Sequence, residues 1–311
     1  MRAIFVHNFG GPDALELVDV PTPEPGPGQI RIKVAAAAVN PVDAETRDGT
    51  LEHAIPADRM PVGVGWDVAG TVDALGAGVD GFTVGEAVTA LDDRLVKDIG
   101  GYAEYVVLDA DAAAHAPRTA DPVAASTLPL NGITAVQSLD LIDLAPDQTV
   151  LVTGAAGAVG GYLVQLAAAR GLHAVALAGT ADESAVKRLG ARTFVARSAD
   201  PAAAVRVVFP DGVDGVIDAA ELRSQVLGAV RDGGKYVNLG PLHGPVETER
   251  GVRVLDQVVH RDQAVLAELA RQVDAGALTL RVADTFPLDQ AAAAHELLGK
   301  GGVRGRIVLV S

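Results

Sequence analysis

The sequence predicts an α/β protein in which an all-β, barrel-like region precedes a doubly wound parallel sheet. Short segments bounded by glycine, proline and aspartate fill the first third of the chain, which is typical of β-strands. From about residue 121, apolar strand-like segments alternate with helical patterns, which indicates a parallel sheet. With 311 residues and 49% hydrophobic content, the chain is long enough to form two domains.

The first third is expected to contain short strands joined by turns. Closely spaced prolines between residues 21 and 28 exclude a helix and form an extended linker into a strand at 29–37. Residues 1–6 are apolar and are expected to form a first strand, because the polar and glycine-rich residues that follow do not fit a signal peptide. Further strands are expected at 67–74, 87–90 and 101–108.

The alternating region begins with predicted helices at 123–126 and 132–139. A long amphipathic helix is expected at 256–276, followed by a last apolar strand at 305–310. The strands between them are predicted at 150–152, 173–178, 193–195, 215–218 and 234–238.

A glycine-rich turn near residue 157 is the most informative motif. It follows the strand at 150–152, precedes a predicted helix at 161–170, and has the spacing A-x-G-x-x-G, with Ala155 where the first glycine usually stands. In such a βαβ unit, glycines keep Cβ atoms away from the pyrophosphate of a dinucleotide, which lies at the helix N-terminus. The sequence therefore predicts a Rossmann-type domain with turn contacts from Gly154, Ala155, Ala156, Gly157, Ala158, Val159 and Gly160.

Composition and charge narrow the possible partners. The net charge of −15 argues against nucleic acid and anionic membranes, although an acidic surface alone also explains it. The absence of cysteine excludes disulfides, thiolate nucleophiles and cysteine-ligated zinc. The uncharged stretch at 151–169 is expected to be a buried strand and helix rather than a membrane span, because of its glycines. A cytoplasmic protein is expected.

Several segments resemble, in order, those of one enzyme family. They are Val39-Asn-Pro-Val-Asp through Gly49, Gly65-Trp-Asp-Val-Ala-Gly-Thr-Val72, Gly101-Tyr-Ala-Glu-Tyr-Val106, Leu128-Pro-Leu-Asn-Gly-Ile-Thr-Ala135, the glycine turn, and the tail from Phe286 to Leu309. Together they resemble the medium-chain dehydrogenase/reductase superfamily, in its zinc-free quinone oxidoreductase-like (zeta-crystallin-like) branch. The resemblance implies a GroES-like domain at 1–120, completed by 265–311, and a Rossmann-type domain at 121–264.

The resemblance also implies an activity and its site. The reaction would be hydride transfer from a nicotinamide to a quinone or an α,β-unsaturated carbonyl compound, with no metal. Trp66 stands where zinc-dependent relatives have a metal-binding turn, and Trp66 and Asn131 are assigned to the substrate pocket. Asn40, with Asp43 beside it, would donate a hydrogen bond to the developing enolate. A turn role for Asn40, and a salt-bridge or helix-capping role for Asp43, are the alternatives.

The cofactor is predicted to be NADPH, with NADH possible. The second strand ends in Ala178-Gly-Thr180, without the carboxylate that usually holds the ribose of NAD. Thr180 and Arg197 would then bind the 2′-phosphate, although the charges of Asp182 and Glu183 would repel it. By family position, the remaining cofactor contacts are Thr134, Gly179, Ala219 and Leu239.

Two other functions stay open. An enoyl reductase or tailoring enzyme of secondary metabolism would share the scaffold, and Arg250, Arg253 and Arg261 could then face a thioester carrier, if they are more than surface charges. A non-catalytic NADPH-binding regulatory protein would bind the cofactor without turnover. The seven histidines are interpreted as surface or packing residues, none of the four tyrosines is assigned as the acid, and a homodimer is expected from the family.

Overall fold

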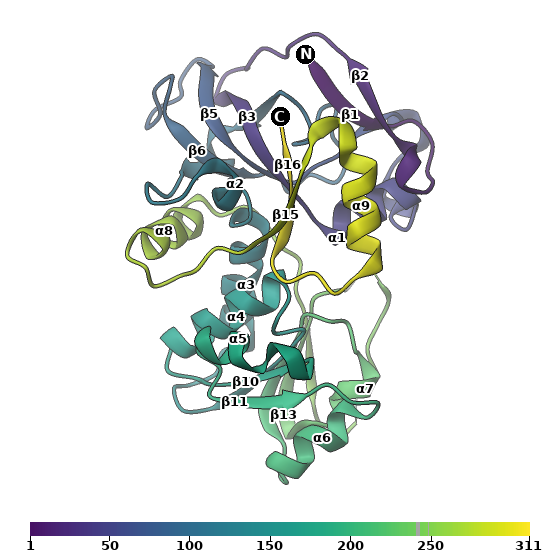
Figure 1. The fold of residues 1–311 in the computed structure, drawn as a ribbon, viewed down its shortest axis with the longest axis vertical. Coiled ribbons are helices and arrows are strands. Elements are labelled where there is room, and N and C mark those ends of the chain that lie inside the picture. The colour runs from purple at the N-terminus through teal and green to yellow at the C-terminus, as the bar shows by residue number, and fades with distance from the viewer. Residues whose placement is uncertain (241–242, 248) are drawn as a thin grey trace. The chain divides into compact units, whose positions relative to one another are not determined.

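The computed structural model describes residues 1–240, 243–247 and 249–311, and the chain divides into two compact units (Figure 1). Unit 1 comprises Met1–Ile133 and His260–Ser311, and unit 2 comprises Thr134–Val259. The expected domain bounds were 120 and 265. Helix α3 (Pro129–Ile142) runs across the first unit boundary, so the chain changes units inside a helix rather than in a linker.

Unit 1 is built around a seven-stranded sheet in the order β15-β16-β3-β5-β6-β8, with β7 paired to β3. Its central strand β3 buries Ile30 and Ile32 completely, and β16 lies between β15 and β3, parallel to β15 and antiparallel to the end of β3. The strands of this sheet are β3 (Gln29–Val39), β5 (Asp67–Leu75), β6 (Ala87–Leu91), β7 (Tyr105–Asp109), β8 (Ala113–His115), β15 (Val282–Pro287) and β16 (Arg306–Val310).

A smaller sheet and short helices complete unit 1. The small sheet has the order β2-β1-β4, so the opening strand is a sheet strand as expected. Its strands are β1 (Arg2–Val6), β2 (Leu15–Asp19) and β4 (Val62–Gly63). The α-helices that lie wholly in this unit are α1 (Pro41–Asp48), α2 (Pro122–Ala125), α8 (Gln263–Asp274) and α9 (Ala291–Lys300), and the one-turn 3-10 helices are η1 (Pro12–Ala14), η2 (Glu52–Ala54), η3 (Ala57–Arg59), η4 (Ala110–Ala112) and η7 (Leu288–Gln290).

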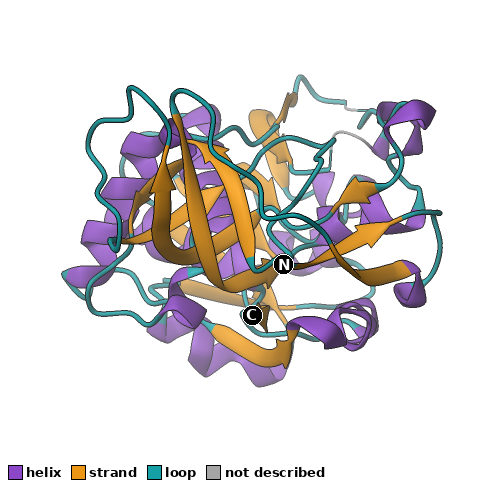
Figure 2. Cartoon of the chain, turned by 90° about the horizontal axis from the view of Figure 1, so that it is seen from above, coloured by secondary structure: helices purple, strands orange, loops and turns teal. Residues whose placement is uncertain are grey.

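Unit 2 contains a six-stranded, fully parallel sheet in the order β11-β10-β9-β12-β13-β14. This is the doubly wound order of dinucleotide-binding domains, in which the direction of winding reverses between β9 and β12. The predicted α/β fold class is therefore confirmed, and Figure 2 marks its strands and helices. The strands are β9 (Thr149–Thr153), β10 (His173–Ala178), β11 (Thr193–Ala196), β12 (Val213–Asp218), β13 (Val230–Asn238) and β14 (Arg253–Asp256). The helices are α4 (Ala158–Ala169), η5 (Thr180–Asp182), α5 (Glu183–Arg188), α6 (Pro201–Val208) and α7 (Ser224–Leu227).

The glycine turn joins β9 directly to α4. Gly154 adopts a φ of +57°, and Gly157 is the N-cap of α4, so the helix begins three residues before the predicted start at 161. A Cβ atom on Gly160 would lie 2.2 Å from the carbonyl oxygen of Gly154, which shows how closely the helix approaches the end of the strand. The stretch at 151–169 is thus divided between a strand and a helix. None of the helices in the described parts of the chain is long and apolar enough to span a membrane.

Two predicted elements are wrong in their extent. The expected helix at 256–276 is in fact the end of β14 and then α8, because Asp256 pairs with Asn238 of β13 and Asp262 caps α8 through a hydrogen bond to the Val265 amide at 3.0 Å. The expected strand at 101–108 begins only at β7, because the amide of Tyr102 donates to Val64 in the turn before β5 instead.

A buried chain of hydrogen bonds links α9 to α1. The guanidinium of Arg47 lies 3.1 Å from Nδ1 of His295, and because arginine only donates, this nitrogen is the acceptor. Nε2 of His295 therefore carries the proton and donates to the Tyr102 hydroxyl at 3.2 Å, which donates to Asp43 at 3.1 Å. His295 was interpreted from the sequence as a surface or packing residue, but its ring nitrogens fix this chain.

The buried imidazole should make stability depend on pH. Burial and the charge of Arg47 lower the pKa of His295 to about 3, so the folded state keeps the ring neutral while the unfolded chain is protonated below about pH 6.5. This stability is present above the unfolded pKa and is lost as pH falls. In His295→Gln the amide can replace both hydrogen bonds without titrating. Between pH 7 and 5, we expect the free energy of unfolding of the wild type to fall by about 2 kcal/mol relative to the variant.

Urea unfolding at several pH values measures this difference. Replacement of the exposed His53 by glutamine is the matched control and should leave the pH dependence of the wild type intact. Parallel stability curves for wild type and His295→Gln would show that the buried ring is not held neutral.

Candidate functional site

The segment after β3 places Asn40 and Asp43 at the start of α1. Asn40 is the N-cap, and Pro41 follows at the first helical position, where its missing N–H costs nothing. The Asp43 side chain accepts a hydrogen bond from the Asn40 amide at 2.8 Å and from the Gly65 amide at 3.1 Å. The capping role considered for Asp43 is therefore present in the structure.

The side-chain amide of Asn40 faces Asp67, the first residue of β5. Its Nδ2 donates to Oδ2 of Asp67 at 2.8 Å and to the carbonyl of Ala38 at 3.3 Å. Both N–H bonds are thus used within unit 1. Oδ1 of Asn40 is buried and makes no hydrogen bond in the described part of the chain, and it faces the backbone amide of Asp43 in a capping-box arrangement. This geometry differs from the expected role of Asn40 as a donor to an enolate, because the free end of the amide is an acceptor.

Two buried carboxyl groups lie beside Asn40. Burial raises the pKa of Asp43 to about 6 and that of Asp67 to about 7, although hydrogen bonds and the charge of Arg306 oppose the shift. Asp67 also accepts a hydrogen bond from the Leu130 amide at 2.6 Å, which ties β5 to the start of α3. Asp67 is not distinguished in the sequence, except that it follows Trp66.

The buried side chain of Lys97 packs over the indole ring of Trp66. The ammonium of Lys97 lies 4.3 Å from the ring centroid, a cation–π distance, and the Lys97 side chain is almost fully buried. Burial lowers the pKa of Lys97 to about 8, while the charges of Asp92 and Asp43 oppose this shift. Lys97 was not predicted as a site residue, because it lies in a charged stretch that looks like an exposed loop.

Asn131 is buried on α3 and uses its polar atoms within unit 1. Its Oδ1 accepts a hydrogen bond from Arg306, and its Nδ2 donates to the carbonyl of Thr127 at 3.1 Å. Asp67 connects the segments that carry the expected residues of this unit. It contacts Asn40, near Asp43 on the same segment, and the amide of Leu130, next to Asn131. Trp66 directly precedes Asp67, so all four expected residues lie on segments that meet at Asp67.

In unit 2, the predicted turn residues surround the N-terminus of α4. Ala155 and Ala156 are buried, whereas the outer side of Gly157 is more open, since a Cβ there would meet only the Gly154 carbonyl, at 3.1 Å. The 12-residue helix directs its N-terminal dipole at this turn. Backbone and dipole together fit the pyrophosphate of a dinucleotide.

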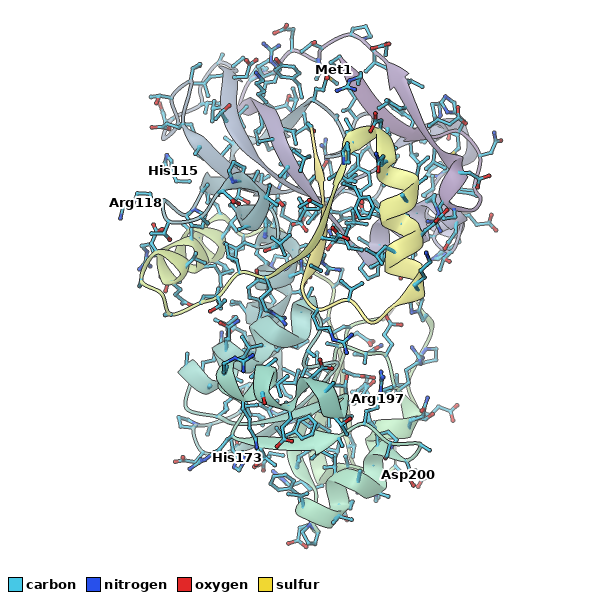
Figure 3. All side chains as sticks on the ribbon, viewed as in Figure 1. Met1, His115, Arg118, His173, Arg197 and Asp200 are labelled. Carbon is cyan, nitrogen blue, oxygen red and sulfur yellow. The ribbon has the colours of Figure 1, made fainter. Side chains whose placement is uncertain are left out.

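The ends of β10 and β11 carry the residues assigned to the 2′-phosphate. Thr180 is exposed, as is Arg197, whose amide donates to Ala178 at 2.7 Å, and Figure 3 labels Arg197 just beyond β11. Asp182 is close to this point, because its Oδ2 lies 3.1 Å from where a Cβ of Gly179 would be. The carboxylate of Glu183 instead forms an ion pair with Lys187, with 2.6 Å between Oε1 and Nζ. The structure thus brings one of the two suspected repulsive carboxylates next to the expected ribose end.

A buried aspartate organises the ends of β9, β12 and β13. Asp218 accepts hydrogen bonds from Thr153 at 2.5 Å, from the Tyr236 hydroxyl at 2.6 Å and from the Arg223 amide at 2.7 Å. Ala219 and Leu239 follow the last residues of β12 and β13 directly. Two members of this network, Thr153 and Asp218, are the polar residues that end β9 and β12, but the sequence pattern alone does not connect them.

Thr134 lies in α3 at the start of unit 2 and is nearly buried, and its carbonyl accepts from the Ser138 hydroxyl at 2.6 Å. No group of three or more histidine and acidic side chains among the described residues is arranged to hold a metal ion. The residues of unit 2 fit a nicotinamide dinucleotide, because the strand order, the glycine turn and the helix N-terminus coincide at the carboxyl end of β9.

Family models match both parts of the chain. Residues 26–118 match the alcohol dehydrogenase GroES-like domain, and residues 189–309 match the zinc-binding dehydrogenase family. Among curated proteins, the quinone oxidoreductase of Sus scrofa is 31% identical over 100% of this chain and 98% of its own.

Solved structures agree with this match. The structure of an NAD-dependent alcohol dehydrogenase is 31% identical, with a TM-score of 0.89 and full coverage of both chains. A mycobacterial protein solved in complex with NADPH is 29% identical, with a TM-score of 0.87 and full coverage of both chains. The chain therefore belongs to the medium-chain dehydrogenase/reductase superfamily of oxidoreductases, in its quinone oxidoreductase-like branch.

Proposed function

We propose that this protein is an NADPH-dependent oxidoreductase that reduces a quinone or an α,β-unsaturated carbonyl compound without a metal. The observation that carries the proposal is the glycine turn at the point where the strand order of unit 2 reverses. The names of similar proteins support a quinone as the acceptor, and the mycobacterial protein supports NADPH. The NAD-dependent alcohol dehydrogenase keeps NADH open as the alternative cofactor.

The chain's own residues would bind the cofactor and orient it. The N-terminus of α4 and the open side of Gly157 suit the pyrophosphate, and Thr180 and Arg197 suit a 2′-phosphate. When bound, the reduced nicotinamide supplies a hydride. Reduction places negative charge on the oxygen of the acceptor, so the protein must supply a hydrogen-bond donor there.

The enoyl reductase alternative has little support in the side chains named for it. Arg250 donates to Asp232 at 2.8 Å and to backbone carbonyls, and Arg261 pairs with Asp109 at 3.0 Å. Both cations are thus engaged within their own units, and the third, Arg253, is an exposed residue of β14.

Cofactor binding and turnover should be measured together. NADPH and NADH are titrated by fluorescence, and consumption is then followed with 1,4-naphthoquinone, 2-cyclohexenone and a short enoyl thioester. Reduction of the quinone or the enone supports the proposal, and preference for the thioester favours the enoyl reductase. Binding without consumption of any acceptor favours a regulatory protein, and no binding of either nucleotide overturns the cofactor assignment.

Substitutions at Gly157 and Gly160 should have different effects, the first on nucleotide affinity and the second on stability. In Gly157→Val, the side chain enters the space assigned to the pyrophosphate, and we expect nucleotide affinity to fall at least about 100-fold, with a smaller loss of stability than in Gly160→Ala because the contact with the Gly154 carbonyl is longer, 3.1 Å. In Gly160→Ala, the Cβ would press on the Gly154 carbonyl, so the melting temperature should fall instead. Titration and thermal unfolding of both variants separate these effects. Wild-type nucleotide affinity in Gly157→Val would contradict the site.

Arg197→Ala should separate the two cofactors. If the guanidinium binds the 2′-phosphate, NADPH affinity should fall about tenfold while NADH affinity stays the same, because only NADPH carries that group. The exposed Arg192 provides the matched alanine control. Equal losses for both nucleotides would show that Arg197 does not distinguish them.

A further inference from the structure

We propose that Lys97 is a catalytic residue whose buried ammonium donates a hydrogen bond, and then a proton, to the carbonyl oxygen of the acceptor. The inference rests on the proposed function and deepens it, because it names the donor that the reaction requires.

The ammonium of Lys97 has unused donors in a buried position. The residue is 2% exposed, and its backbone carbonyl is fixed by the Gly63 amide at 2.9 Å. The side chain contacts the ring of Trp66, but within the described ranges it makes no hydrogen bond or ion pair. The ammonium carries three donors, and Nζ is not among the fully buried polar atoms that lack a partner in the described part of the chain, so it is open to solvent and to a ligand oxygen.

The charged groups around Lys97 have other partners. Asp92 is held by Arg94 through two contacts, at 2.7 and 2.9 Å, and Asp93 accepts from the Arg261 amide at 2.9 Å. Asp43 accepts from two backbone amides and from Tyr102. These three carboxyl groups contribute to the electrostatic field at Lys97, but none of them accepts a hydrogen bond from its ammonium.

Asn40 does not supply the donor in this arrangement. Both of its N–H bonds go to Asp67 and Ala38, and its remaining polar atom, Oδ1, is an acceptor. Lys97 is the better donor, because a charged N–H bonds more strongly to a developing oxyanion than a neutral amide does.

The step is balanced without a further reactant. The hydride brings two electrons to the acceptor, the C=O double bond becomes a C–O single bond, and the negative charge forms on oxygen. One N–H bond of Lys97 breaks as an O–H bond forms, which gives a hydroquinone or an enol and leaves a neutral amine that regains a proton from water. A pKa of about 8 suits this transfer near neutral pH.

Trp66 is the only tryptophan, so its fluorescence reports on this position directly. Lys97→Met removes the charge and keeps the length of the side chain, and Lys97→Arg keeps the charge. In the wild type without ligands, we expect Trp66 fluorescence to change with a midpoint near pH 8, and we expect no such transition in Lys97→Met. With NADPH and 1,4-naphthoquinone, kcat should fall about 100-fold in Lys97→Met and be partly restored in Lys97→Arg, with NADPH affinity unchanged.

The control is Lys33→Met, an exposed lysine of the same unit, which should behave as the wild type. Quenching of Trp66 by 1,4-naphthoquinone in the presence of NADP⁺ measures acceptor binding without turnover, and Lys97→Met should weaken it. Wild-type quenching and kcat in Lys97→Met would overturn the assignment. If the wild type reduces no acceptor, the proposed function fails, and the quenching comparison still decides whether Lys97 contacts the quinone.

Discussion

The buried carboxyl group of Asp43 is the interaction on which unit 1 depends. It accepts hydrogen bonds from the amides of Asn40 and Gly65 and from the Tyr102 hydroxyl, so one side chain fixes the start of α1, the turn before β5 and the loop before β7. The Tyr102 hydroxyl also accepts a hydrogen bond from Nε2 of His295, so α9 is connected to Asp43 as well. Removing the carboxyl group would leave three buried donors without an acceptor, and each would cost about 1–3 kcal/mol. The residues around Trp66 therefore owe their positions to a side chain that need not touch a reactant.

Unit 2 was the more predictable part from sequence, because its elements follow local rules. Strands such as 215–218 are apolar runs that end at a polar residue, and the observed β12 extends only two residues further toward the N-terminus. The errors arose where tertiary contacts override local pattern. The stretch at 256–276 looks like one helix until the pairing of β14 with β13 and the capping of α8 by Asp262 divide it. The early start of α4 likewise depends on the close approach of Gly160 to Gly154, which helix propensity does not describe.

For the candidate site, the sequence indicated segments but not the contacts that their side chains make. The motif around Asn40 indicated the segment, yet only the structure shows that Asp67 takes its amide. Burial of Lys97 could not be predicted, because five of the seven residues from 92 to 98 are charged and such runs are usually solvated. The proximity of Asp182 to Gly179 also depends on a turn of η5 that brings a carboxylate back toward the strand end. In each case a long-range or turn contact decides the chemistry.

The contact between Trp66 and Lys97 bears on how this protein would polarise a carbonyl group in the proposed reaction. The indole of Trp66 cannot ligate a metal, but its face attracts a cation. In the proposed role, Lys97 supplies one positive charge in a buried setting, where electrostatic attraction to an oxyanion is stronger than in water. Unlike a divalent ion, an ammonium can also give up its proton, so polarisation of the carbonyl and protonation of its oxygen would be tasks of one group. Because burial lowers the pKa of Lys97 to about 8, the same setting that strengthens the interaction also prepares the proton for transfer.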